Sequence, residues 1–289
     1  MRRGRILIAL VIAVISIISY YSVKQENPIT GQTQHIAMDV DQEVALGLEA
    51  APQMAQEAGG LDPDPDVQRL VSQVGEHVVS SSDAHDTPYQ FHFYALADEQ
   101  TVNAFALPGG PVFITRGLLS KLSTEAELAG VLGHEVGHVV GRHTAAQIAK
   151  SRLAQGLIGA AGVAGSDEYG HGQQTAQLAA LAAQMLQLKY GRGDEIQADT
   201  LGVRFMAEAG YDPRALIQVM RVLSETSGPS RGPEFLSTHP DPGNRSQVIT
   251  AAIERRFPNG IPGNLTMGAR LASASASRDR VITGEFAER

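Results

Sequence analysis

The sequence of 289 residues contains no cysteine, so disulfide bonds and thiolate metal sites are excluded. It also lacks an excess of positive charge. The formal net charge of -8 argues against a nucleic-acid partner, which usually meets a basic surface. Internal repeats and phosphate-binding glycine loops are absent as well. With 43% hydrophobic residues, the chain can bury a sizeable core, and we expect one large domain with appendages.

An uncharged run near the N-terminus, residues 6–23, predicts a helix of membrane length, because its span of about 27 Å matches the hydrocarbon core of a bilayer. Arg2, Arg3 and Arg5 precede the run and should stay cytoplasmic, which places the remainder of the chain outside the cytoplasm. Residues 19–22 read Ser-Tyr-Tyr-Ser and offer a poor cleavage site. We therefore expect residues 1–23 to be a signal-anchor, with a cleaved signal peptide as the alternative.

The remainder of the chain predicts an α+β fold that is predominantly helical with a small β-sheet. Residues 24–38 are polar and are interpreted as a linker, residues 39–258 as the main domain, and residues 259–289 as an irregular tail. Alternating aromatic residues predict a strand over 89–96, and a second strand is expected over 112–115. Helices are expected over 39–58 with an interruption at Pro52, from 64–65 onward, from 125 towards 155, over 173–190, over 194–209, after 212–213 and over 247–256.

Residues 156–172 are rich in glycine and lie between two expected helices. This composition is typical of a mobile lid over a site, and equally of a flexible connector. The sequence leaves both interpretations open.

The stretch "VLGHEVGHVVGRH" predicts a metal site on a helix. His134 and His138 are four residues apart and project from one helix face, so both imidazoles can reach one tetrahedral ion. Glu135 is rotated away from that pair, in the position of a general base acting on water. His143 points elsewhere on a continuous helix, and we expect it to support the site rather than bind the metal.

Four glycines, at positions 130, 133, 137 and 141, flank the two histidines. Each costs up to about 1 kcal/mol relative to alanine in a helix interior. Close approach of another backbone beside the ligands would compensate for that cost, and tight helix packing without chemistry is the compatible alternative.

A catalytic zinc usually has three protein ligands and an open position. Glu195, in "RGDEIQAD", is the candidate for the third ligand, and Asp199 lies one turn further on the same helix face. Asp199 could accept a hydrogen bond from the free N–H of a ligand histidine and fix its tautomer.

Four blocks, "NAFALPGG", "ELAGVLGHEVGHVVGRH", "RGDEIQADTLGVRFM" and "STHPDPGNR", together resemble the zincin-like gluzincins of peptidase family M48, the family of HtpX and the CAAX prenyl proteases. The nearest resemblance is to bacterial extracytoplasmic members with one globular domain. It implies one Zn²⁺ per chain, bound by His134, His138 and Glu195, with Glu135 as the base. The single predicted membrane span differs from the integral-membrane members and argues against processing of prenylated peptides.

The resemblance also implies roles for residues around the metal. His239 could approach the zinc or the reacting carbonyl, or could be inert. Arg245 could stabilise developing negative charge, or could pair with an acid. Asn103 is expected beside the cleft, in contact with substrate or with the motif helix.

The expected function is hydrolysis of peptide bonds in misfolded or unfolded extracytoplasmic proteins, by a domain anchored in the bacterial inner membrane and facing the periplasm. If the signal is cleaved, the domain would instead be exported in soluble form. A membrane-tethered, zinc-stabilised chaperone-like module is the alternative from another class, but it would not need Glu135. A latent protease, closed by the glycine-rich segment or by His239, is a third interpretation.

Overall fold

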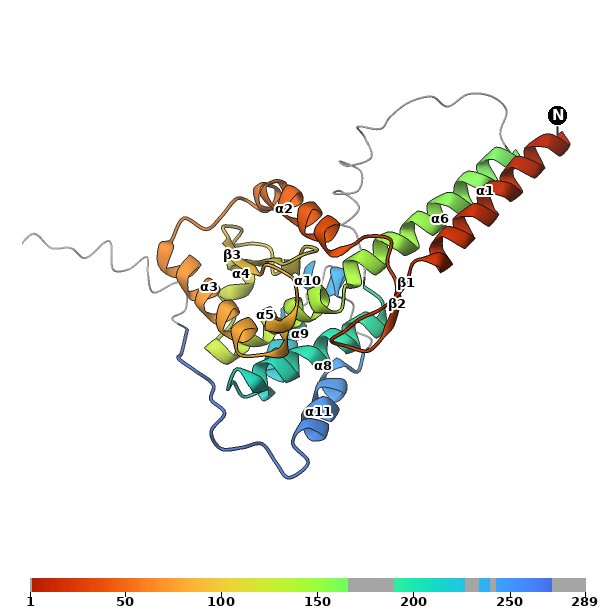
Figure 1. The fold of residues 1–289 in the computed structure, drawn as a ribbon. Coiled ribbons are helices and arrows are strands. Elements are labelled where there is room, and N and C mark those ends of the chain that lie inside the picture. The colour runs from red at the N-terminus through yellow and green to blue at the C-terminus, as the bar shows by residue number, and fades with distance from the viewer. Residues whose placement is uncertain (1, 166–189, 227–233, 240–242, 272–289) are drawn as a thin grey trace, which may run out of the picture.

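The computed structural model describes residues 2–165, 190–226, 234–239 and 243–271. The expected fold class is confirmed: helices surround a small β-sheet, and an apolar helix lies at the N-terminus (Figure 1). The helices are α1 (Arg2–Ser22), α2 (Val40–Glu57), α3 (Pro65–Ser80), α4 (Arg116–Leu119), α5 (Glu125–Val140), α6 (His143–Gly165), α8 (Arg192–Glu208), α9 (Arg214–Glu225), α10 (Glu234–Thr238) and α11 (Arg245–Arg256), with a 3₁₀ turn η1 (Asp83–Asp86). The strands are β1 (Lys24–Glu26), β2 (Thr33–His35), β3 (His92–Leu96), β4 (Ala104–Ala106) and β5 (Pro111–Thr115).

The main sheet has the strand order β3-β5-β4. The central strand β5 pairs in parallel with β3 and antiparallel with β4. Within the described residues, β4 is therefore an edge strand of this sheet. Successive side chains of a strand point to opposite faces. On β5, Phe113 therefore packs with α2 residues, whereas Val112 and Ile114 face the core shared with α3 and α5.

Helix α2 runs without interruption through Pro52, contrary to the sequence-based expectation. Proline removes one backbone donor and usually kinks a helix. Here Ala50 and Met54 lie on either side of the proline, and both are buried against the same apolar cluster under the sheet. We attribute the continuity of the helix to that shared apolar contact.

Helix α5 is the centre of the domain, and all its residues from Ala126 to Val140 are buried. Its N-terminus is capped by Thr124, whose hydroxyl accepts the backbone N–H of Glu127 at 3.3 Å. The Glu127 carboxylate in turn accepts the backbone N–H of Ser123 at 2.6 Å.

The helix expected to run from 125 towards 155 is broken at Gly141 and Arg142, between α5 and α6. Arg142 has a φ of 54°, the left-handed region that a non-glycine residue seldom adopts. Its guanidinium is held by the buried carboxylate of Glu43, with Nε 2.9 Å from Oε1, and by Gln25 at 2.8 Å. Side-chain contacts distant in sequence therefore stabilise this turn.

Residues 24–38, expected to be a linker, contain an antiparallel hairpin of β1 and β2. The hairpin is bound to the end of α5: Asn27 Nδ2 donates to the carbonyl oxygen of Val140 at 2.7 Å, and Gln34 donates to that of Gly141. These acceptors are among the last carbonyls of a helix, which lack partners within the helix itself. The segment thus caps the helix of the HEVGH motif.

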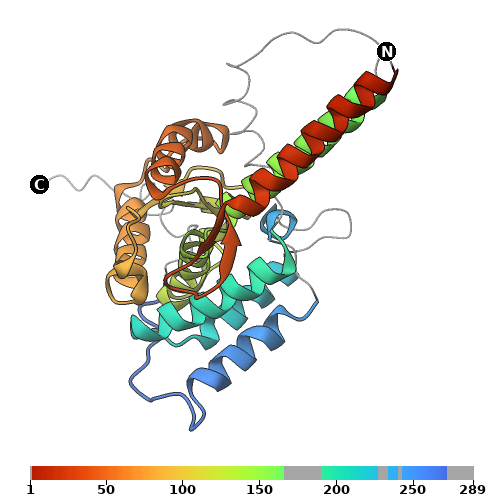
Figure 2. The ribbon, with the colours of Figure 1, turned by 45° about the vertical axis from the view of Figure 1, so that its right-hand side comes forward.

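Helices α1 and α6 leave the globular body side by side as a long pair (Figures 1 and 2). The first part of the glycine-rich segment, 156–165, belongs to α6 and is therefore not a loop. Its remainder, 166–172, and nearly all of the helix expected over 173–190 lie outside the described residues.

The described part of the tail, 259–271, is irregular and lies along the body. It makes isolated bridges from Thr266 to Tyr211 and from Arg270 to Thr124, at the start of α5. Residues 272–289 lie outside the described chain.

Candidate metal centre

The two histidines of the HEVGH motif lie on one face of α5, with their Nε2 atoms 3.0 Å apart. Helix α8 packs directly on this part of α5. A Cβ added at Gly137 would lie 3.0 Å from the carbonyl oxygen of Ala198, and one added at Gly133 would lie 3.6 Å from the Cα of Gly202. The close backbone approach predicted from the glycines is therefore confirmed at these two positions.

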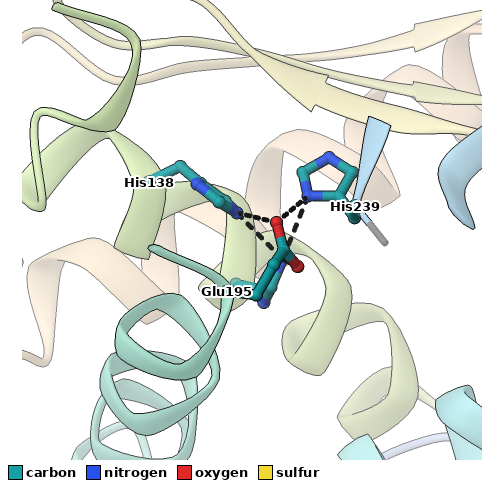
Figure 3. Close-up of side chains that lie close together, drawn as sticks. His138, Glu195 and His239 are labelled. Carbon is teal, nitrogen blue, oxygen red and sulfur yellow. Dashed lines mark hydrogen bonds and ion pairs between the residues drawn. The ribbon is translucent and has the colours of Figure 1, made fainter. Parts of the chain in front are cut away.

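Because α8 approaches so closely, its first turn brings Glu195 to the two imidazoles. The carboxylate oxygens Oε2 and Oε1 lie 3.5 Å from Nε2 of His134 and of His138, respectively. His239, at the end of α10, completes the group, with Nδ1 3.1 Å from Oε1 of Glu195 (Figure 3). Segments far apart in sequence thus converge at one point.

These four side chains fit a zinc ion. Each offers one ligand atom, and the four atoms all lie within 4.8 Å of one another. All four residues are buried, and imidazole nitrogen with carboxylate oxygen is a donor set that zinc prefers. The predicted zinc cofactor is thus supported by the donors present, and the chain would bind it through His134, His138, Glu195 and His239.

Asp199 lies behind the donor group and orients His134, as the sequence predicted. Its Oδ1 is 3.0 Å from Nδ1 of His134, the ring nitrogen that faces away from the other donors. Arg245 binds the same carboxylate in bidentate fashion, from Nε at 3.0 Å and from a terminal nitrogen at 2.7 Å. Arg245 thus pairs with an acid, the second of the two roles considered for it.

The charges of this group favour ionised acids. Burial raises the pKa of Glu195, but the neighbouring His239 and the hydrogen bonds from His134 and His239 outweigh burial and lower it. Burial likewise raises the pKa of Asp199, and the guanidinium of Arg245 lowers it below the usual value. Two ionised carboxylates around imidazoles form a site suited to a divalent cation.

The surroundings of Glu135 differ from those of Glu195 and Asp199. It is fully buried, and neither carboxylate oxygen has a hydrogen-bond partner among the described residues. Nε2 of His239 is 3.7 Å from its Oε1. Burial raises the pKa of Glu135, and nearby His239 and His134 only partly oppose this effect. A carboxyl group in this state is suited to accept and release a proton.

His143 lies outside the donor group, but the expectation that it points elsewhere on a continuous helix is wrong. The break before α6 turns its ring back, so that Nδ1 lies 2.8 Å from Nδ1 of His138, and Nε2 lies 2.7 Å from Gln197 Oε1. Tyr190, which the sequence analysis missed, stacks on His138 with ring centroids 3.9 Å apart. Its hydroxyl lies 2.9 Å from that of Thr144. No local pattern in the sequence signalled this aromatic contact.

A cleft of about 320 Å³ opens beside the donor group. The edge strand β4 and its flanks line one side, α2 another, and His239 with Tyr190 the inner end. Asn103 lies on this wall as predicted, and its Oδ1 is buried without a hydrogen-bond partner among the described residues. The cleft therefore leads from an edge strand to the candidate metal centre.

Comparison with known proteins agrees with this geometry. The model of peptidase family M48 matches residues 65–253. The chain belongs to peptidase family M48. The resemblance drawn from the four sequence blocks is thus confirmed.

Curated relatives include β-barrel assembly-enhancing proteases and mitochondrial metalloendopeptidases. The protease of Yersinia pestis is 34% identical over 75% of this chain and 45% of its own length, and a putative one from Vibrio cholerae is 33% identical over 80% and 47%. The mitochondrial metalloendopeptidase OMA1 of Arabidopsis thaliana is 37% identical over 54% and 30%. The chain spans about half the length, or less, of these relatives.

Proposed function

We propose that this protein is a zinc-dependent endopeptidase that hydrolyses misfolded or unfolded proteins of the bacterial cell envelope. The observation that carries the proposal is Glu135: a buried carboxylate without a hydrogen-bond partner among the described residues, one position along α5 from a metal ligand. Structural metal sites have no use for such a group, whereas metal-assisted hydrolysis requires a base there.

Zinc bound by the donor group would supply Lewis acidity, which activates water and polarises a carbonyl group. Glu135 would take the proton of the attacking water at one carboxylate oxygen and pass it to the nitrogen of the leaving amine. Burial raises the pKa of Glu135 above its usual value, which favours uptake of a proton by this carboxylate. Burial of the surrounding side chains excludes competing water.

The edge strand β4 supports binding of an extended substrate. An unfolded segment could add to β4 as a further strand, which uses main-chain hydrogen bonds and imposes little sequence preference. The Oδ1 atom of Asn103 faces no protein donor, and we propose that it accepts an N–H from that segment. Loose specificity of this kind suits a protease that removes misfolded chains.

Helix α1 and the relatives of the chain support a proposal for the cellular location of the enzyme. Gly4–Ser22 is long and apolar enough to cross a membrane, and the preceding arginines favour a cytoplasmic N-terminus. The printed names of two relatives refer to β-barrel assembly, a process of the bacterial envelope. We propose an anchor over 1–23 and an extracytoplasmic metallopeptidase domain over 39–258, flanked by the segments 24–38 and 259–289.

The decisive test substitutes Glu135 with Gln in the full chain. Metal content, measured by elemental analysis, should equal that of the wild type, and cleavage of casein should fall by about 10³-fold or more, because a general base and its charge are lost. Undiminished cleavage with full metal content would instead favour the zinc-stabilised chaperone-like module.

A further inference from the structure

Two helices, not one, leave the body in the direction of the proposed membrane. Helix α1 has a mean hydropathy of 2.1 over its most apolar window, and only 6% of that window is buried. Helix α6 lies along it for most of its length (Figures 1 and 2). The two run antiparallel, because the N-terminus of the chain lies at the far tip, whereas α6 starts at the body.

The distal half of α6 has the composition of a membrane segment. Beyond Lys150 and Arg152, residues 153–165 contain no charged side chain. The side chain of Ile158 is 72% exposed and that of Leu157 is 39% exposed. A helix on the surface of a soluble domain normally presents charged or polar residues on its outer face. Apart from Gln155, the residues marked as exposed in this half are apolar or glycine, and the exposed residues of α1 beside it are mainly apolar.

Small residues set how the two helices fit together. A Cβ added at Gly156 would lie 2.2 Å from Oγ of Ser16, so the backbones approach closely at this level. Ala160 on α6 and Ala9 on α1 are also buried. Contacts between small residues are typical of helix pairs within bilayers.

This contact fixes the register and aligns the polar boundaries of both helices. Arg152, four residues before Gly156, lies level with Tyr20, and the neighbouring Tyr21 is exposed. At the other end, Gly165 lies level with Leu7, just short of Arg5. Tyrosine and basic side chains are enriched at membrane interfaces. Near the body both helices therefore change from polar to apolar at the same level, and the uncharged stretch that they share is about 20 Å long at 1.5 Å per residue.

We infer that residues 153–165 of α6 form a second membrane-embedded helix, bound to an uncleaved α1, and that the lipid hydrocarbon covers its exposed face. The inference rests on the anchor within the proposed function and extends it from one helix to a pair. Continuity with α1 selects lipid as the occupant, because the exposed apolar residues of the two helices lie side by side and begin at the same polar level near the body. A second copy of the chain on this face would shield Ile158 from lipid.

Because the chain has no native cysteine, the exposure of α6 to lipid can be measured directly with single cysteine variants. Single variants Ile158→Cys, Ile15→Cys and Leu61→Cys are labelled with an environment-sensitive fluorophore and reconstituted in phosphatidylethanolamine and phosphatidylglycerol vesicles containing nitroxide-labelled acyl chains. The three side chains are similarly exposed, at 72%, 61% and 52%, but Leu61 lies on the globular body. We expect the label at 158 to be quenched about as strongly as the label at 15, and the label at 61 to keep its emission.

Quenching at 15 without quenching at 158 would overturn the inference and leave the anchor in place. An absence of quenching at both positions would overturn the inference and the anchor together. Gly159→Cys serves as a second labelling position, because an added Cβ there meets nothing within 4 Å. Peptide cleavage is not measured in these arms, so a failure of the proteolytic proposal would not affect them.

A second measurement tests the register. The pair Ser16→Cys and Gly156→Cys should form a disulfide on mild oxidation in the same vesicles. A Cβ added at Gly156 lies 2.8 Å from the Cβ of Ser16, so a shift of about 1 Å between the helices gives the Cβ spacing of a disulfide. The matched pair Ser22→Cys and Gly156→Cys, displaced by roughly 9 Å along α1, should not. Equal cross-linking of both cysteine pairs, or no cross-link between positions 16 and 156, would contradict the pairing of α1 with α6 on which the inference depends.

Discussion

The two sides of the metal centre differ in how their polar atoms are paired. On the inner side, Asp199 is bound by His134 and by both donors of a bidentate Arg245. On the cleft side, the oxygens of Glu135 and Oδ1 of Asn103 are also buried but have no hydrogen-bond partner among the described residues. Unpaired buried polar groups cost free energy, so a fold tolerates them where water or substrate supplies the missing partner. The hydrogen bonds of the inner side therefore stabilise the site, and the polar atoms of the cleft side can bind water or substrate.

The largest effect should come from breaking the inner side. Arg245→Met should lower the free energy of unfolding by about 3–5 kcal/mol, because it leaves the buried carboxylate of Asp199 without its cation. Arg214→Met is the matched control, since Arg214 also pairs with an aspartate but its side chain is 63% exposed. That variant should cost about 0–1 kcal/mol. Denaturant unfolding of the full chain in detergent measures both, and equal costs would remove the distinction between the two sides.

His239 contacts both sides and offers a way to sharpen the comparison. Its Nδ1 lies among the ligand atoms, and its Nε2 lies 3.7 Å from Glu135. Four protein donors are typical of a closed zinc site, whereas a catalytic site keeps one position open. We expect His239→Ala to weaken zinc binding and, at saturating zinc, to raise the cleavage rate of casein by about tenfold, equivalent to about 1.4 kcal/mol. A lower rate would instead assign His239 to stabilisation of the reacting carbonyl.

The smallest effect is expected on the cleft side. Asn103→Ala removes an oxygen that has no hydrogen-bond partner among the described residues, so the free energy of unfolding should change by less than about 0.5 kcal/mol. The loss of one substrate hydrogen bond should lower kcat/KM for casein several-fold, corresponding to about 1 kcal/mol. A loss of stability without a change in kcat/KM would place Asn103 on the structural side.

Residues that share a local pattern could be predicted from the sequence. Helical spacing placed His134 and His138 on one face, and the glycines beside them correctly indicated a close neighbour. Glu195 and Asp199 were correctly placed near the motif because they lie one turn apart on a single helix. The inclusion of His239 among the ligand atoms could not be fixed, because only tertiary packing decides whether a loop histidine approaches the metal.

Features that depend on distant partners were predicted wrongly or missed. The left-handed Arg142, which breaks the expected long helix, is held by Glu43 and Gln25 from about a hundred residues earlier. The continuity of α2 through Pro52 likewise depends on an apolar cluster under the sheet. Local propensity contains no information about such contacts, so the break at Arg142 was missed and Pro52 was taken as a helix interruption.

The hairpin of β1 and β2 has a practical consequence for recombinant production. A soluble fragment designed from the predicted domain boundary would start at residue 39 and lose the side chains of Asn27 and Gln34, which cap the end of α5. A fragment that keeps these two hydrogen bonds has to start before Asn27. Such a fragment would also uncover the face of α6 that packs on α1, so it calls for detergent or a shortened α6 to remain monodisperse.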